Sequence, residues 1–188
     1  MVEGRRLYTK YGDEGETSLL YGGRVSKADR HCEAYGATDE TVSALGLARA
    51  LSQDERVRRT LLELERELFT VGAELATAPN RYDTFKRHFT PLSEAMTSRL
   101  EGLIDDLQGE VTLPRSFILP GASPASAAMD LARTSVRRAE REVVRLKDAG
   151  GLVNPEILRY LNRVSDLLFI LARYEDQGLP MEKLTGNE

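Results

Sequence analysis

The N-terminal stretch RLYTKYGDEGETSLLYGGRVSK, from Arg6 to Lys27, combines glycines, hydroxyl side chains and cations before any helical pattern begins. Glycine lets backbone N–H groups approach a ligand closely and accepts positive φ angles. Hydroxyls and cations beside such a backbone suit a polyanion, most simply a phosphate chain. The spacing is not that of a P-loop, because the chain contains no G-x-x-x-x-G-K-[ST]. Composition alone supports equally well an N-terminal arm with a hairpin turn.

A second candidate for phosphate binding is the segment ARTSVRRAERE, in which Arg133, Arg137 and Arg141 recur every four residues. Like charges at this helical spacing repel each other by about 0.2–0.5 kcal/mol per pair. Guanidinium groups stacked along one face would suit a phosphate chain, because each guanidinium group can bind two phosphate oxygens at once. The competing interpretation is a solvated face whose charge is partly offset by Glu140 and Glu142.

Three further motifs contain residues whose presence needs an explanation. Asn162 lies inside LRYLNRVSDLLF, although asparagine is a poor helix former, so it either bridges to a neighbouring helix or binds a ribose or base. Asp39 and Glu40 lie in the first predicted helix and could face the arginines of the later helix. Phe117 belongs to the apolar loop FILPGASP, and anchoring of this loop in the core is its favoured interpretation.

The motifs that are absent limit the chemistry. His31 and His88 share no motif with Cys32 or a serine that would indicate a catalytic triad. Neither H-E-x-x-H nor the Glu-x-x-His pairs of di-iron bundles occur. The single cysteine excludes an intrachain disulfide and a zinc cluster built on thiolates. We therefore expect no metal site made by protein ligands, and any catalysis would depend on positioning and electrostatics.

The elements that position these residues are helices. Apolar residues recur at alternating steps of four and three, which predicts an all-α five-helix bundle. The recurring residues are Val57, Leu61, Leu64, Leu68, Val71 and Leu75; Met96, Leu100, Leu103 and Leu107; Ala132, Val136, Ala139, Val143 and Leu146; and Ile157, Leu161, Val164, Leu168 and Leu171. The segment from about Asp29 to Leu51 is less regular. Pro91 is predicted in the first turn of the third helix, and Asn154 and Pro155 at the N-cap and first position of the fifth.

Length and composition indicate one domain over residues 1–188, with a glycine-rich nucleotide-binding loop over 1–28, the bundle over 29–177 and a frayed tail over 178–188. The formal net charge of −4 gives no overall reason to expect a nucleic-acid partner. No apolar run approaches the length of a membrane span, and no apolar signal region is present. We expect a cytoplasmic protein without a membrane partner.

Five motifs occur in the same order as in the PduO-type ATP:cob(I)alamin adenosyltransferases: YTKYGDEGETSLLYGGRVSK, YGATDETVSALG, FILPG, ARTSVRRAER and YLNRVSDLLF. The chain resembles this family from about Leu7 to Arg173. The resemblance implies a homotrimer with active sites between subunits. It also implies transfer of the 5′-deoxyadenosyl group of ATP to cob(I)alamin, which forms adenosylcobalamin and releases triphosphate. ATP would act with Mg²⁺, cobalamin would be a substrate, and a cobalamin reductase and a B12-dependent enzyme are candidate partners.

The resemblance also assigns residues. Arg137 is the main catalytic candidate, Asp39 and Arg133 would pair between neighbouring subunits, and Phe117 would displace the lower axial ligand of cobalamin so that cob(II)alamin is easier to reduce. The implied ATP-binding residues are Thr9, Lys10, Tyr11, Gly12, Thr17, Ser18, Lys27, Arg137, Arg138, Ala139, Glu140, Arg141 and Asn162.

Four residues depart from the family pattern. Tyr11 stands where threonine is usual, Val42 where asparagine is frequent, Ala122 at the second glycine of Pro-Gly-Gly, and Asp130 at a common histidine. None of these departures falls on Lys27, Arg137 or Asn162. A non-catalytic nucleotide-binding helical bundle remains the alternative, and a purely structural oligomeric bundle is a weaker one.

Overall fold

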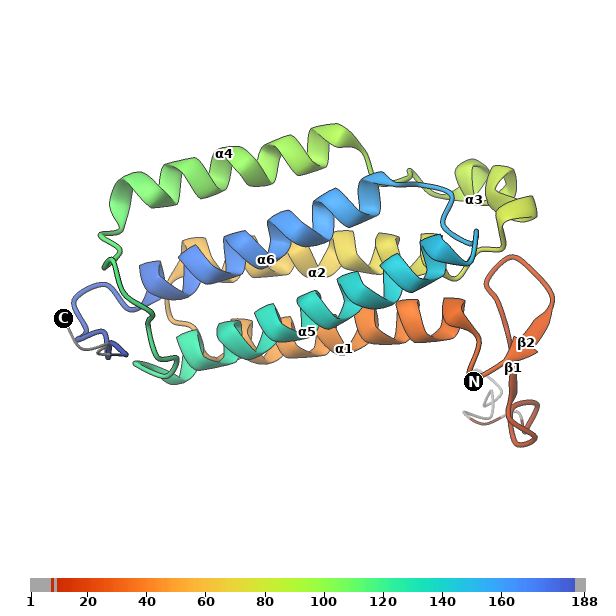
Figure 1. The fold of residues 1–188 in the computed structure, drawn as a ribbon, viewed down its shortest axis with the longest axis horizontal. Coiled ribbons are helices and arrows are strands. Elements are labelled where there is room, and N and C mark those ends of the chain that lie inside the picture. Colours follow the sequence, from red (N-terminus) through yellow and green to blue (C-terminus); the bar gives the residue numbers. More distant parts are fainter. Residues whose placement is uncertain (1–7, 9, 185–188) are drawn as a thin grey trace, which may run out of the picture.

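The structure is a computed structural model, and it describes residue 8 and residues 10–184. Five long helices dominate the described part of the chain: α1 (Arg30–Leu51), α2 (Glu55–Leu75), α4 (Glu94–Glu110), α5 (Pro124–Asp148) and α6 (Glu156–Glu175). Figure 1 shows them running roughly along one axis as a single elongated bundle. The predicted all-α bundle is therefore confirmed. A 3-10 turn η1 (Pro79–Arg81) and a short helix α3 (Tyr82–His88) lie between α2 and α4, and the sequence pattern did not indicate them because they are too short to show a period.

The predicted apolar seams form the core. α1 packs against α2 and α5, while α6 packs against α5 and α4. The seam residues of α2, α5 and α6 are all buried. Of the α4 seam residues, Leu100 and Leu107 are buried, and Met96 and Leu103 are half-buried. The reason is that α4 lies at the edge of the bundle and packs mainly on α6.

Polar caps fix the helix ends. Asp29 accepts a hydrogen bond from the His31 N–H of α1 at 2.8 Å, and Ser123 forms a reciprocal capping box with Ser126 of α5. The Asn154 side chain accepts from the Glu156 N–H at 3.1 Å, as predicted, although α6 begins one residue later than expected. The prediction for Pro91 is wrong: α4 begins at Glu94, because the Leu92 N–H donates to the buried Glu74 carboxylate at 3.1 Å and stays outside the helix.

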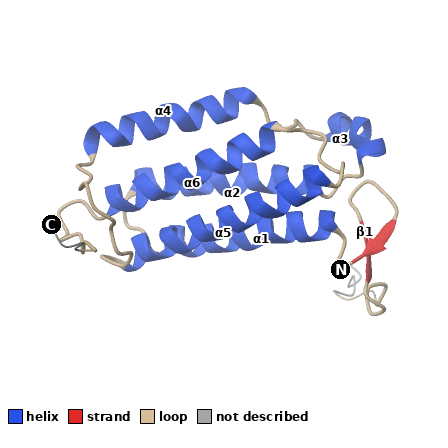
Figure 2. Ribbon diagram, in the orientation of Figure 1, coloured by secondary structure: helices blue, strands red, loops and turns tan. Residues whose placement is uncertain are grey.

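The segment that precedes α1, residues 10–27, forms the N-terminal hairpin. Strands β1 (Glu16–Ser18) and β2 (Arg24–Ser26) pair antiparallel, with Thr17 opposite Val25. Two backbone hydrogen bonds of 2.9 Å, Leu20 N–H to Ala76 O and Ala78 N–H to Tyr21 O, attach the hairpin to the end of α2. Figure 2 shows the strands at the end of the bundle where α1 begins.

The C-terminal segment is ordered by pairing, so the prediction of a frayed tail from residue 178 is wrong for its described part. Gly178 adopts φ 87° and turns the chain back. Residues 179–184, here called the C-terminal strap, then run beside residues 112–122, the Phe117 loop. Ile118 and Lys183 form an isolated antiparallel bridge. No helix of the described residues is long and apolar enough to cross a membrane.

Candidate nucleotide and corrinoid site

The N-terminal hairpin brings several predicted ATP contacts together. Lys10 has φ 63° and Gly15 has φ 82°, so the chain folds tightly ahead of β1. The Lys27 N–H donates to Gly15 O at 2.8 Å, and a Cβ on Gly12 would lie 3.1 Å from Lys27 Nζ. Glycine at position 12 is what allows the Lys27 ammonium group to lie against the loop.

The other predicted contacts of the hairpin are placed less closely. Tyr11 is exposed, and its carbonyl oxygen accepts from Arg24 Nη2 at 2.7 Å. Thr17 is half-buried and Ser18 is exposed on β1. Thr9 lies outside the described residues. The hairpin therefore presents two lysines, hydroxyls and close-packed backbone, a combination that favours a phosphate chain.

The arginines of α5 form one wall of a cavity of about 290 Å³, here called the arginine cavity. It is lined by Arg133 and Arg137 of α5, by Ser165, Asp166, Phe169 and Ile170 of α6, by Ile104 and Gln108 of α4, and by Leu113. Within the described part of the chain, Arg137 forms no ion pair. Arg141 donates to the Arg137 carbonyl oxygen at 2.9 Å. Of the two arginines that line the cavity, Arg137 is thus the one without an ion pair among the described residues, because Arg133 contacts Asp130.

The interpretation of a solvated face holds only for other residues of α5. Arg138 pairs with Glu40 of α1, and Arg145 pairs with Glu142. Glu140 does not offset an arginine, because it accepts a hydrogen bond from the Asn162 amide at 3.5 Å. Arg133 and Arg137 are therefore not neutralised by the glutamates that the sequence offered.

Asn162 bridges α5 and α6, which is one of the two roles predicted for it. Its amide nitrogen reaches Glu140, and its Oδ1 accepts from Arg163 Nη1 at 2.7 Å. Ala139 is fully buried in the core, so any contact that it made to a ligand would have to pass through its backbone.

A buried carboxylate, that of Asp130, binds one of the two arginines that line the cavity. Asp130 is 4% exposed and accepts from Arg173 Nη1 of α6 at 2.9 and 2.8 Å. The same carboxylate accepts from Arg133 Nε at 3.3 Å. Arg173 also lies over the Phe169 ring, with 4.6 Å between the guanidinium carbon and the ring centroid. Asp130 stands out in the sequence as a departure from the family pattern, whereas Arg173, the buried partner that explains it, does not.

Asp39 lies on a different surface from Arg133. It lines an apolar groove of about 390 Å³ between α1 and α2, together with Leu20, Tyr35 and Phe69. No ion pair between Asp39 and Arg133 forms within the chain as the structure describes it. The predicted pair could therefore form only between two chains, and it stays a prediction.

Burial and a hydrogen bond to Cys32 raise the pKa of Tyr35 to about 12. The Tyr35 hydroxyl donates to Cys32 Sγ at 3.3 Å, at the end of α1 near the hairpin. Tyr35 therefore stays neutral at physiological pH and cannot act as a base there.

Phe117 is 82% exposed, so its expected anchoring in the core is wrong. The Phe117 loop is held by backbone pairing to the C-terminal strap rather than by a buried aromatic ring. An aromatic ring held in solvent is typical of a surface that meets a ligand or a partner.

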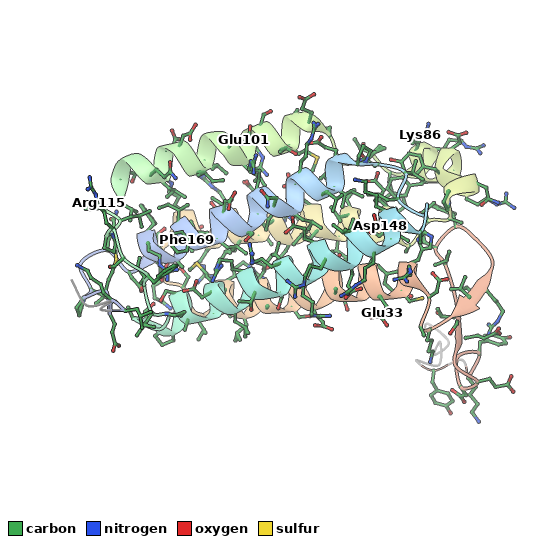
Figure 3. All side chains as sticks on the ribbon, viewed as in Figure 1. Glu33, Lys86, Glu101, Arg115, Asp148 and Phe169 are labelled. Atoms are coloured by element: carbon green, nitrogen blue, oxygen red, sulfur yellow. The ribbon has the colours of Figure 1, made fainter. Side chains whose placement is uncertain are left out.

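The hairpin and the Phe117 loop lie at opposite ends of the bundle. The Phe117 loop precedes the first residue of α5, while the hairpin adjoins the end where α5 finishes. The 25 residues of α5 span about 37 Å at 1.5 Å per residue. Figure 3 shows Arg115 and Phe169 in one half of the bundle, and Glu33 and Asp148 in the other. One chain therefore carries two separated halves of the predicted site.

Comparison with known proteins gives a consistent result. The family model described as cobalamin adenosyltransferase matches residues 7–175. The corrinoid adenosyltransferase PduO of Salmonella typhimurium is 41% identical over 170 residues, which cover 90% of this chain and 49% of that protein. The chain thus spans about half the length of this relative. The corrinoid adenosyltransferase of Mycobacterium leprae is 39% identical over 178 residues, which cover 92% of each chain.

Solved structures agree. A variant of a PduO-type ATP:corrinoid adenosyltransferase from Lactobacillus reuteri, complexed with cobalamin and ATP, matches with a TM-score of 0.86 and 33% identity, over 96% of this chain and 100% of that one. A second variant from the same organism, complexed with ATP, also has a TM-score of 0.86 and 33% identity, over 95% of this chain and 100% of that one. These matches confirm the resemblance seen in the motifs. The chain belongs to the cobalamin adenosyltransferase family.

Proposed function

We propose that the chain transfers the 5′-deoxyadenosyl group of ATP to cob(I)alamin, forms adenosylcobalamin and releases triphosphate. One observation carries this proposal: the fold matches, over 96% of the chain, a corrinoid adenosyltransferase solved with cobalamin and ATP. The described side chains are compatible with the phosphates of ATP. The hairpin offers lysines and hydroxyls to phosphates, and the arginine cavity adds the guanidinium group of Arg137.

The proposed reaction needs no proton transfer at the reacting carbon. Cob(I)alamin is itself a strong nucleophile. The cobalt–carbon bond forms at C5′ as the C5′–O bond breaks, its electron pair leaves on the triphosphate, and cobalt rises formally from +1 to +3. This suits a site that offers cations to the leaving triphosphate.

The role of the protein is then to orient ATP and to stabilise the leaving triphosphate. Lys27, held against Gly12, would bind the phosphate chain. Arg137, free of ion pairs among the described residues, would stabilise the charge that develops on the leaving oxygen.

No group of three or more histidine, cysteine, aspartate or glutamate side chains among the described residues could hold a metal ion. We propose that Mg²⁺ reaches the site with ATP, bound to the oxygens of its phosphates. When bound there, Mg²⁺ would neutralise part of the phosphate charge.

We further propose that the active chain is a homotrimer. The hairpin and the Phe117 loop lie at opposite ends of one chain, so a common site requires the hairpin of one subunit and the Phe117 loop of the next. A head-to-tail interface of this kind forms a ring of three when each subunit is rotated by a third of a turn from the one before it. Asp39 of one chain and Arg133 of the next would pair across it.

The proposal also includes a setting for the reaction. The protein would act in the cytoplasm, receive reducing equivalents from a cobalamin reductase, and pass adenosylcobalamin to a B12-dependent enzyme.

The test is to incubate the protein with ATP, Mg²⁺ and chemically reduced cob(I)alamin without oxygen, and to follow the corrinoid spectrum. We expect conversion to a light-sensitive adenosylated product and release of triphosphate. Binding of ATP with no spectral change would instead support the alternative, a non-catalytic nucleotide-binding bundle.

The catalytic assignment is tested with Arg137→Lys, which keeps the charge but loses the planar fork. We expect turnover to fall by about 10²–10³, as for loss of a preorganised donor. Arg145→Lys is the matched control on the same helix, because Arg145 pairs with Glu142 and does not line the cavity. Equal turnover of Arg137→Lys and the unmodified protein would contradict the assignment.

A further inference from the structure

We propose that the C-terminal strap is a positioning element for cobalamin activation, because it sets the orientation of the loop that presents Phe117. This inference rests on the proposed adenosyltransferase function. It assigns a role to residues 179–184, which sequence analysis treated as a tail.

The contacts between the strap and the loop are regular. The Leu119 N–H donates to Glu182 O at 2.9 Å, and the Leu184 N–H donates to Phe117 O at 2.9 Å. Ile118 and Lys183 lie opposite each other between these two bonds. The strap thus holds the backbone on both sides of Ile118, including the carbonyl group of Phe117 itself.

The Phe117 loop has little else to hold it. All side chains of residues 112–122 are exposed or half-buried. Among the described residues, the only backbone–backbone hydrogen bonds of this loop are the two that join it to the strap. A loop without buried side chains or internal bonds takes its conformation from whatever it pairs with.

The strap is fixed at its own base. Gln177 donates from Nε2 to Glu110 O at 2.9 Å, and the Leu179 N–H donates to Asp176 O at 2.9 Å. Pro180 further restricts the backbone. Because only residues 176–178 separate the strap from α6, the strap ties the Phe117 loop to the helix that carries Phe169 and part of the wall of the arginine cavity.

This arrangement separates two steps of the reaction. Reduction of cob(II)alamin takes one electron from an external donor of the reduced-flavin class and gives cob(I)alamin. This step would depend on how Phe117 meets the corrinoid. The attack of cob(I)alamin on C5′ of ATP would depend on the hairpin and Arg137. Loosening the strap should therefore slow the first step and spare the second.

The test is Leu184→Pro, which removes the N–H that bonds to Phe117 O. Proline also biases the preceding residue toward extended backbone, which the bridge at Lys183 already requires. Lys183→Ala is the matched control, because it alters the neighbouring side chain and keeps both hydrogen bonds. A second pair compares truncation after Gly178, which deletes the strap, with truncation after Leu184, which leaves it.

Each variant is assayed twice: from preformed cob(I)alamin, and from cob(II)alamin with a reduced flavin. We expect Leu184→Pro to lower the rate from cob(II)alamin by about fivefold, the factor that corresponds to one net backbone hydrogen bond. Truncation after Gly178 should lower it further, and both controls should match the unmodified protein. The rate from cob(I)alamin should stay within about twofold for all four, since these residues lie outside the hairpin and the arginine cavity.

Equal loss from both starting states in Leu184→Pro, or no loss from either, would overturn the proposal. Failure of the proposed function would look different, because the unmodified protein would then not adenosylate cob(I)alamin at all.

Discussion

The carboxylate of Asp130 holds Arg133 in place at the wall of the arginine cavity. One of its oxygens is shared by Arg133 Nε and Arg173 Nη1, and both Asp130 and Arg173 are almost fully buried. The two guanidinium groups and the one carboxylate together have a net charge of about +1. Arg133 is the member of this group that lines the cavity. Removal of the carboxylate would leave Arg173 charged, buried and unpaired.

We therefore predict that Asp130→Asn lowers the free energy of unfolding by about 3–5 kcal/mol, the cost of breaking a buried ion pair. Urea denaturation followed by circular dichroism measures this change. Asp166→Asn is the control, because Asp166 is exposed and its contact with Arg163 is 3.5 Å long. Its expected effect is below about 1 kcal/mol. Similar effects of the two substitutions would show that the Asp130 pair is not a buried anchor.

Of the pair Asp130 and Arg173, only Asp130 could be singled out from the sequence. Asp130 stood out because the resemblance leads one to expect histidine there. Arg173 did not stand out, because a basic residue in the last turn of a helix is ordinarily solvated and favoured by the helix dipole. Its burial follows from the packing of α5 on α6 across 43 residues of sequence, which no local pattern records.

Tyr35 gives a pH-dependent prediction at the same scale. Burial and the hydrogen bond to Cys32 raise its pKa to about 12 in the folded protein, from about 10 in an unfolded chain. Between pH 10 and 12 the unfolded state therefore loses a proton that the folded state keeps, so stability falls as pH rises through this window. Below pH 10 this contribution is constant.

The measurement is the free energy of unfolding as a function of pH, for the unmodified protein and for Tyr35→Phe. We expect Tyr35→Phe to show a shallower loss of stability between pH 10 and 12. Identical slopes would mean that Tyr35 titrates normally. Tyr82 also has a raised pKa, because of burial and its hydrogen bond to Glu74, so part of the slope should remain in the variant.

Among the elements, the N-terminal hairpin is the one whose shape most directly serves the proposed ATP site. Two backbone hydrogen bonds to the end of α2 fix the position of the hairpin. Within the hairpin, the Lys27 side chain packs against Gly12. A methyl group at position 12 would come within 3.1 Å of Lys27 Nζ and 3.3 Å of Cε, so the ammonium group would have to move.

We predict that Gly12→Ala weakens ATP binding while the fold is kept. The matched control is Gly23→Ala in the same hairpin, where an added Cβ would meet nothing within 4 Å. Isothermal titration calorimetry with ATP and Mg²⁺ measures the difference. We expect a loss of about tenfold in affinity for Gly12→Ala, corresponding to about 1.4 kcal/mol, and little change for Gly23→Ala. Equal affinities would show that Lys27 does not bind the phosphates from this position.

The elements that sequence analysis predicted best are those with a long period. The seams of α2, α5 and α6 repeat over several turns, so the core followed from the pattern of apolar residues. The C-terminal strap was missed because its pairing uses backbone groups of two short irregular segments, which have no side-chain signature. Phe117 was misplaced for a related reason. An aromatic residue in an apolar loop usually anchors the loop in the core, but here backbone pairing to the C-terminal strap holds the loop and leaves the ring exposed.

At the scale of the whole molecule, the bundle holds the two halves of the predicted site apart. Motifs report which residues belong to a site, but not whether one chain can bring them together. The distance of about 37 Å along α5 decides this point, since neither half can reach the other within a rigid bundle. We therefore propose that each site takes its hairpin from one subunit and its Phe117 loop from the next.

Subunit mixing tests this claim most directly. Lys27→Ala disables the hairpin half and Phe117→Ala the corrinoid half, so each variant alone should be nearly inactive when the assay starts from cob(II)alamin. In randomly mixed trimers, about one site in four joins an intact hairpin to an intact Phe117 loop of the neighbouring subunit. We expect an equal mixture of the two variants, co-expressed and purified together, to recover about a quarter of the activity of the unmodified protein. Activity no greater than that of the separate variants, in mixed trimers verified by mass spectrometry, would contradict it.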